Sequence, residues 1–139
     1  MGIITVSASP DNVEKVTNYI NEQLENAMCP MKAQMQIGVA VEEIFVNIVN
    51  YAYGGKIGEV EIFIDTEESP KTVTIVFKDS GIQYNPLEKE DPDIALSSDE
   101  RPIGGLGIFM VKKLMDDVIY RYEDGKNILE IRKLINEKG

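Results

Sequence analysis

The sequence predicts a two-layer α/β (α+β) sandwich, in which a mixed, mostly antiparallel sheet is covered on one face by helices. Three observations support this fold class. Apolar residues recur at helical spacing over about residues 9–52. From Val60 onward the period changes to the alternation of strands, and short turns join these strands into antiparallel hairpins. A chain of 139 residues, 43% of them hydrophobic, fits one globular domain over residues 1–139.

One strand and two helices are predicted in the N-terminal part of the chain. The β-branched residues 3–6 favour a short strand. A helix is predicted over about residues 9–27, because a serine N-cap and a first-turn proline precede its apolar positions. After Pro30 the longest helix is predicted over residues 31–52, where a tyrosine and two glycines end it.

Four strands and one helix are predicted in the C-terminal part. Between the second of these strands and the helix, residues 82–103 contain three prolines and show little hydrophobic periodicity. A structureless loop of about 20 residues is uncommon in a compact domain and is usually functional or disordered. The predicted elements are strands at 60–65 and 73–77, a helix at 108–115, and strands at 118–122 and 128–134.

Composition excludes several classes of function. The chain has 14 Lys and Arg against 24 Asp and Glu, so its formal net charge of −10 argues against broad contact with nucleic acid or an anionic membrane. It has no histidine and a single cysteine, which removes histidine-based metal sites and catalysis and an internal disulfide. No apolar run approaches the roughly 20 residues of a membrane helix, and no signal peptide pattern is present. We therefore expect a cytoplasmic domain.

Polar groups gather on one side of the second helix. Glu43, Asn47 and Asn50 fall within about 60° of each other on a helical wheel, opposite the apolar arc. A carboxylate and an amide oxygen one turn apart suit a hard cation such as Mg²⁺. The alternative is a solvated helix face, and the helix by itself favours that alternative.

Two glycine-containing segments follow. Asp79 ends a predicted strand two residues before Gly81, which suits close approach of a ligand but also describes an ordinary turn. The run Gly104-Gly105-Leu106-Gly107 opens a helix, where free backbone N–H groups and the helix dipole favour an anion. A flexible loop is the alternative. Neither a Walker-type phosphate loop nor a dinucleotide-binding GxGxxG unit is present.

In this order and at these distances, the three segments resemble the ATP-binding domain shared by DNA gyrase, histidine kinases and MutL, the GHKL superfamily with the Bergerat-type fold. Glu43-x-x-x-Asn47 resembles its N box, Asp79-x-Gly81 its first glycine box, and the run 104–107 its second. The stretches 41–53 and 104–116 are more narrowly similar to the anti-sigma factor serine-protein kinases of Gram-positive bacteria. The resemblance extends from about residue 3 to residue 134 and makes the loop 82–103 a short lid.

The resemblance implies a role for each matching residue. Asn47 would coordinate the Mg²⁺ that bridges the ATP phosphates, and Glu43 would be the general base for the acceptor serine. Asp79 would accept a hydrogen bond from the adenine amino group, with Gly81 leaving room for the ring. The phosphates would be bound by backbone N–H groups of the second glycine box, which comprises Gly104, Gly105, Leu106 and Gly107.

The chain also departs from the family pattern. Ile48 and Tyr51 stand where family members often have alanine and histidine. A threonine commonly follows the last strand-turn glycine and helps to hold the adenine-binding aspartate; here Lys126-Asn127 follows, so we expect Asn127 to replace it or the contact to be weakened. Arg101 in the lid would reach a phosphate, or would simply be a solvated loop charge.

The resemblance leads to a Mg-ATP-dependent serine kinase that binds a sigma factor and phosphorylates a serine of an anti-anti-sigma protein. It also implies a homodimer. One alternative is an ATP-sensing switch that changes partner affinity without turnover. Another is a histidine-kinase-like ATPase domain acting in trans, since the chain has no histidine of its own to phosphorylate.

Overall fold

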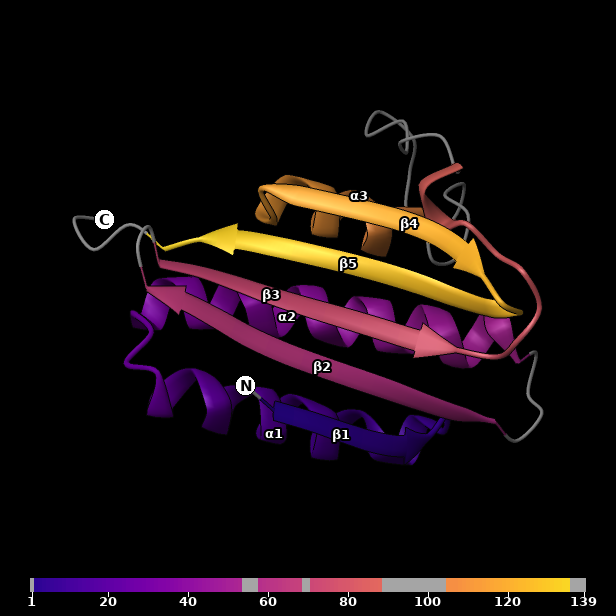
Figure 1. Cartoon of the computed structure of the whole chain (residues 1–139), viewed down its shortest axis with the longest axis horizontal. Helices are drawn as coiled ribbons and strands as arrows, with labels where there is room; N and C mark the ends of the chain where they lie inside the picture. The colour runs from indigo at the N-terminus through magenta and orange to yellow at the C-terminus, as the bar shows by residue number, and fades with distance from the viewer. Residues whose placement is uncertain (1, 54–57, 69–70, 89–104, 136–139) are drawn as a thin grey trace.

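The structure is a computed structural model of the chain, and it describes residues 2–53, 58–68, 71–88 and 105–135. Five strands form one sheet in the order β1-β2-β3-β5-β4, and every pairing is antiparallel. Three helices lie on one side of this sheet, as Figure 1 shows. The strands are β1 (Gly2–Ser7), β2 (Glu59–Glu68), β3 (Lys71–Asp79), β4 (Asp117–Glu123) and β5 (Lys126–Leu134), and the helices are α1 (Val13–Asn26), α2 (Met31–Asn47) and α3 (Gly105–Leu114).

The predicted two-layer sandwich is confirmed, and the sheet is antiparallel throughout its described strands rather than mixed. The reason is that β5 inserts between β3 and β4 and runs opposite to both. Each predicted strand and helix is present, with ends that differ by a few residues. Among the described helices, none is both long and apolar enough to cross a membrane.

The helices are held to the sheet by a continuous apolar core. Helices α1 and α2 each bury one side, and their buried residues form one cluster with the inward side chains of β2 and β3. Burial of this apolar surface is the main stabilising term and fixes α2 relative to the ends of the strands. The largest fully buried side chains include Ile20, Leu24, Ile37, Ile44, Phe45, Ile62, Ile64, Ile75, Phe77, Ile108 and Ile131.

Helix α2 does not continue as an α-helix to residue 52, as the periodicity predicts. It ends at Asn47, and Ile48–Ala52 forms a single π-helical turn. Such turns are often found at functional sites. The carbonyl oxygen of Ala52 accepts a hydrogen bond from the Ile82 N–H at 2.7 Å, which joins the end of this turn to the loop after β3.

The hairpin between β4 and β5 is closed by Asp124 and Gly125, both with positive φ, 53° and 75°. Positive φ at both central residues is the pattern of a type I′ turn, for which Asp-Gly is a preferred pair. This tight turn sets the register of β5 against β4. On its other side β5 pairs with β3, in a register that places Asn127 directly opposite Asp79.

Candidate functional site

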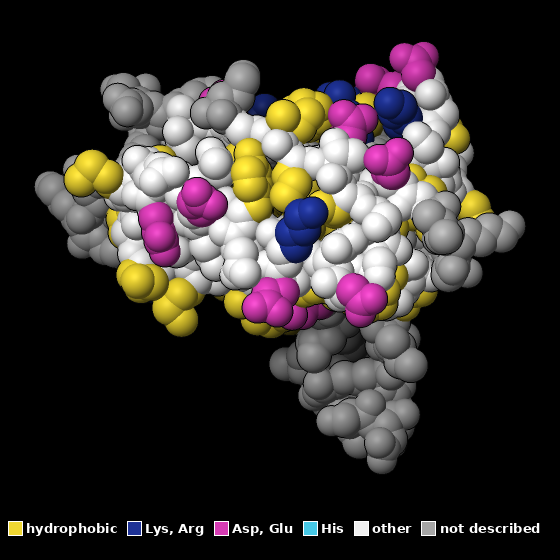
Figure 2. Space-filling model, turned by 90° about the horizontal axis from the view of Figure 1, so that it is seen from below, with side chains coloured by type: hydrophobic (Ala, Val, Ile, Leu, Met, Phe, Trp, Pro, Cys, Tyr) yellow, Lys and Arg dark blue, Asp and Glu magenta, His cyan; other side chains and the backbone are white. Residues whose placement is uncertain are grey.

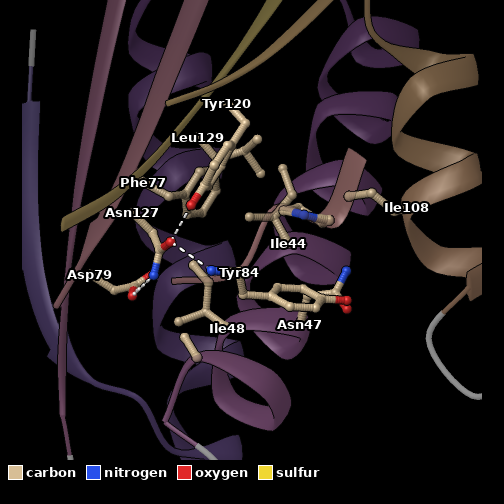
Figure 3. Close-up of a pocket in the computed structure, with 12 residues that line it drawn as sticks. Ile44, Asn47, Ile48, Phe77, Asp79, Tyr84, Ile108, Tyr120, Asn127 and Leu129 are labelled. Carbon is tan, nitrogen blue, oxygen red and sulfur yellow. Dashed lines mark hydrogen bonds between the residues drawn. The ribbon is translucent and has the colours of Figure 1, made fainter. Parts of the chain in front are cut away.

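A small pocket, with a cavity volume of about 30 Å³ and partly open to solvent, lies between α2, α3 and the ends of β3 and β5. Figure 3 shows the side chains of α2 on one side of it and those of the strands on the other. Polar groups are few and lie among apolar ones, as is usual in small-molecule sites. The lining residues are Ile44, Asn47, Ile48, Ala52, Phe77, Asp79, Tyr84, Pro86, Ile108, Tyr120, Asn127 and Leu129.

At the strand end of the pocket, Asp79 and Asn127 form a buried polar pair, with 4% and 5% of their surfaces exposed. The Asn127 Nδ2 donates to Asp79 Oδ1 at 2.9 Å, and the Gly81 backbone N–H donates to the same oxygen at 2.9 Å. Burial raises the pKa of the Asp79 carboxyl above its ordinary value, while these two hydrogen bonds lower it in part. The predicted contact between Asn127 and the aspartate is therefore present.

Both the nitrogen and the oxygen of the Asn127 side-chain amide make hydrogen bonds at this end of the pocket. Besides the bond to Asp79, Nδ2 donates to the Ile82 carbonyl oxygen at 2.9 Å. Its Oδ1 accepts from the Tyr84 backbone N–H at 3.0 Å and from the Tyr120 hydroxyl at 2.5 Å. One side chain thus connects β3, β4 and the loop that leads into the predicted lid.

Two residues of this arrangement, Tyr84 and Tyr120, are not predicted from the sequence. The ring of Tyr84 extends across the pocket toward Asn47 (Figure 3) and stacks on Tyr51, with ring centres 5.1 Å apart. The sequence signal for Tyr84 is weak: it is an aromatic residue three positions after Gly81, in a loop that mixes polar and apolar residues. Tyr120 gives no such signal, since its place opposite Leu129 depends on the register of β4 and β5.

Gly81 is required by close packing. A Cβ at this position would lie 2.6 Å from the carbonyl carbon of Ala52 and still closer to its oxygen. Only a residue without a side chain lets the loop after β3 approach the π-helical turn this closely. The hydrogen bond from Ile82 to Ala52 depends on that approach.

Asn47 lines the helix end of the pocket, and Glu43 lies one turn earlier on α2, outside the lining. Asn47 is buried, with 7% of its surface exposed, whereas Asn50 is exposed to solvent. The prediction that all three residues share a face opposite the core is corrected here. The cause is twofold: α3 packs against this side of α2, and the π-helical turn changes the direction in which Asn50 points.

Glu43 is partly buried against α3. Burial, and to a smaller degree the charge of Glu42, raises the pKa of the Glu43 carboxyl above its ordinary value. Gly107 lies directly against it, since a Cβ there would overlap Glu43 Oε2 and lie 3.2 Å from its Cδ. The first turn of α3 and the carboxylate of Glu43 are thereby brought together, as the predicted site requires.

Not every predicted residue lies in the described part of the chain. Gly104, Arg101 and lid residues 89–103 lie outside it, while Gly105 and Leu106 are described as the beginning of α3. The first N–H groups of a helix have no partner within the helix, so this end of α3 can donate to an anion. The loop of 82–88, which ends in a 3-10 turn at Pro86–Glu88, is the described part of the predicted lid.

A divalent cation would depend on few protein ligands. No group of three or more Asp, Glu, Cys or His residues that could hold a metal is found among the described residues. The amide oxygen of Asn47 is a hard ligand of the kind that Mg²⁺ accepts, together with waters and phosphate oxygens of a substrate. The donor set therefore fits a cation that is bound mainly through its nucleotide.

Several known proteins are similar to this chain in sequence or in fold. The chain is 29% identical over 104 residues to serine-protein kinases named RsbW from Bacillus thuringiensis (strain Al Hakam) and Bacillus cereus (strain AH820). The match covers 72% of this chain and 64% of each relative, so the chain spans less than two thirds of the length of these relatives.

Among solved structures, the RsbU and RsbW domains of Rv1364c from Mycobacterium tuberculosis match 97% of this chain and 33% of that one, with a TM-score of 0.66 and 14% identity. A blue-light activated histidine kinase from Erythrobacter litoralis EL346 matches 77% of this chain and 32% of its own, with a TM-score of 0.58 and 17% identity. At these identities the likeness concerns the fold alone. The family profile described as histidine kinase-like ATPase domain matches residues 6–133. The chain belongs to the histidine kinase-like ATPase domain family, and within it is similar to the RsbW serine-protein kinases.

Proposed function

We propose that the protein is a Mg-ATP-dependent serine kinase that acts as an anti-sigma factor. It would bind a sigma factor and phosphorylate a serine of an anti-anti-sigma protein, as the similarity to the RsbW kinases suggests. The observation that carries the proposal is that Asp79 and Asn127 lie at one end of the pocket while Asn47 lines its other end, with Glu43 one turn away on α2. A cytoplasmic location and a homodimer are part of this proposal.

The nucleotide would be oriented by both ends of the pocket. Asp79, fixed by two donors on Oδ1, would accept from the amino group of adenine, and Gly81 would leave room for the base. The phosphates would lie near Asn47 and the start of α3, where backbone N–H groups favour negative charge. Bound Mg²⁺ would neutralise part of the phosphate charge.

Glu43 would act on the acceptor serine. Its carboxylate would take the hydroxyl proton while the serine oxygen forms a bond to the γ-phosphorus and the bond to the leaving oxygen of ADP breaks. A raised pKa makes a carboxylate a stronger base, and burial against α3 raises it here. Gly107 supports this role because it allows α3 to pack on Glu43.

The test uses Mg-ATP, a serine-bearing anti-anti-sigma protein from the same genome, and detection of phosphoserine. We expect Glu43→Gln to abolish transfer and to leave ATP affinity within a few-fold of wild type. ATP binding without phosphoserine would instead support the nucleotide-sensing switch. Transfer to a histidine of a second protein would support the trans-acting ATPase. Absence of ATP binding would refute all three functions.

A further inference from the structure

The outward side of α2, away from the sheet, carries exposed apolar side chains. Met31, Met35, Val39 and Val46 fall within about 80° of each other on the helix, so they form one stripe. Their surfaces are 68%, 65%, 41% and 36% exposed, and Met28 just before the helix is 84% exposed. This stripe lies opposite the residues with which α2 packs on the sheet. None of its residues lines the pocket described above.

Helix α1 places carboxylates beside this stripe. Its buried positions Val16, Ile20 and Leu24 face the core, so Glu22 and Glu25 point outward, and both are exposed. Gln34 Nε2 of α2 donates to Glu25 Oε1 at 3.3 Å, which places that carboxylate at the flank of the stripe. Figure 2, viewed from the α1 and β1 edge, shows carboxylate and apolar side chains next to each other at one end of the molecule.

The charge on this outward side is mainly negative. Glu42 is exposed within the stripe itself, and together with Glu14, Glu22 and Glu25 of α1 it gives four carboxylates. The exposed cations on the outward sides of the two helices are Lys15 and Lys32. An apolar ridge bordered by carboxylates is complementary to a helix with one apolar and one basic face.

The apolar residues are of a kind suited to binding. Three of the five are methionines, whose flexible and polarisable side chains adapt to different partners. Met28 has φ 60° because it ends α1 in a Schellman-type turn, in which the Cys29 N–H donates to the Leu24 carbonyl oxygen at 2.9 Å and the Met28 N–H to the Glu25 carbonyl oxygen at 3.0 Å.

We propose that the apolar ridge formed by the stripe of α2, with the carboxylates of α1 beside it, binds a basic amphipathic helix of a partner protein. The stripe from Met31 to Val46 is about 22 Å long, which corresponds to four helical turns. Its exposed area, on the order of 500 Å², is as large as the largest apolar patches on ordinary monomers but below the roughly 800 Å² per partner of a standard interface. A single docked helix therefore fits better than a second copy of this chain.

The experiment uses the whole protein with methyl-¹³C methionine and a 16-residue probe peptide, with Leu at positions 1, 5, 8, 12 and 15 and Lys at most others. We expect the methyl signals of Met28, Met31 and Met35 to shift on titration, and that of the buried Met115 to stay. Met35→Glu/Val39→Glu should weaken binding at least tenfold, measured by fluorescence anisotropy. Ile119→Glu, an exposed apolar position on β4, is the matched control and should leave affinity unchanged. A peptide with Glu in place of Lys should not bind.

Three results would overturn the proposal: undiminished binding by the double variant, equal binding by the Glu peptide, or shifts at other methyl groups only. A wild-type dimer that Met35→Glu converts to a monomer in light scattering would identify a second copy as the occupant, and would also overturn it. Circular dichroism and ATP affinity of the double variant, both expected to match wild type, show whether its fold and the pocket remain intact. The inference is independent of the proposed kinase activity.

Discussion

Replacing Asn127 by leucine, which has similar size and no hydrogen-bonding groups, should destabilise the protein in a pH-dependent way. The change leaves the buried Asp79 carboxylate with the Gly81 N–H as its remaining donor on Oδ1. A hydrogen bond to a charged group contributes about 1.5–3 kcal/mol, and the other partners of Asn127 lie near solvent, where water can replace part of the loss. We expect a loss of about 3 kcal/mol in the free energy of unfolding at about pH 8.

The pH dependence follows from the direction of the Asp79 pKa. Because the folded-state pKa lies above the unfolded one, the contribution of Asp79 to stability is present below the unfolded pKa and is lost as the pH rises through the folded pKa. Asn127→Leu removes an interaction that lowers this pKa, so the variant's pKa rises further. Protonated Asp79 no longer needs the amide donor, and the loss should therefore shrink between about pH 8 and an acid pH below the folded-state pKa of Asp79 in the variant.

Urea unfolding at both pH values measures this effect, with unchanged m-values as the check that both proteins unfold alike. Asp79→Asn provides the control background, where the same Asn127 change removes a bond between neutral groups and should cost only about 1 kcal/mol. A loss below about 1 kcal/mol at pH 8, or an equal loss at both pH values, would refute the account of a charged acceptor held by Asn127.

Four further predictions follow from the geometry. Gly81→Ala forces a Cβ onto the Ala52 backbone and should lower the free energy of unfolding in urea by more than about 2 kcal/mol. The control is Gly38→Ala, whose Cβ would lie 3.8 Å from its nearest neighbour, and which should be neutral or stabilising by up to about 1 kcal/mol. Equal effects of the two changes would contradict the packing argument. Gly107→Ala displaces only the end of the Glu43 side chain, so thermal stability should hold while serine transfer falls at least tenfold; unchanged transfer would separate Gly107 from the proposed base. The rate of serine phosphorylation should decline as the pH falls through the pKa of Glu43, which lies above its ordinary value of 4.5. Glu42→Gln should move that decline to lower pH, because it removes one cause of the raised pKa. A pH profile that does not move would argue against Glu43 as the base. Gly125→Ala, at φ 75° with no atom within 4 Å, should cost about 1 kcal/mol in chemical denaturation through backbone strain alone.

Most of the fold could be predicted because local patterns determine it. The alternation in β2 and β3, the N-cap at Ser9 and the Asp-Gly turn at Asp124 each act within a few residues of the sequence. The π-helical turn at Ile48–Ala52 could not be predicted, since a change of hydrogen bonding over one turn barely alters the spacing of apolar residues.

The site was predictable in its polar residues but less so in its surroundings. Glu43, Asn47, Asp79 and Asn127 carry chemical signals in the sequence. The burial of Asn47 does not, because α3 covers that side of α2 from more than 50 residues away in the chain. A helical wheel describes one buried side and one exposed side, and it cannot show a third helix.

The aromatic residues of this protein give it a built-in optical reporter. The chain has six tyrosines and no tryptophan, so no indole dominates its near-ultraviolet signal. Tyr84 and Tyr120 line the pocket, Tyr51 stacks on Tyr84, and the Tyr53 hydroxyl accepts from the Ser80 N–H at 2.9 Å. Near-ultraviolet circular dichroism and tyrosine emission should therefore report mainly on the pocket and its loop. Ligand titrations of the unlabelled protein can then be followed without any added dye.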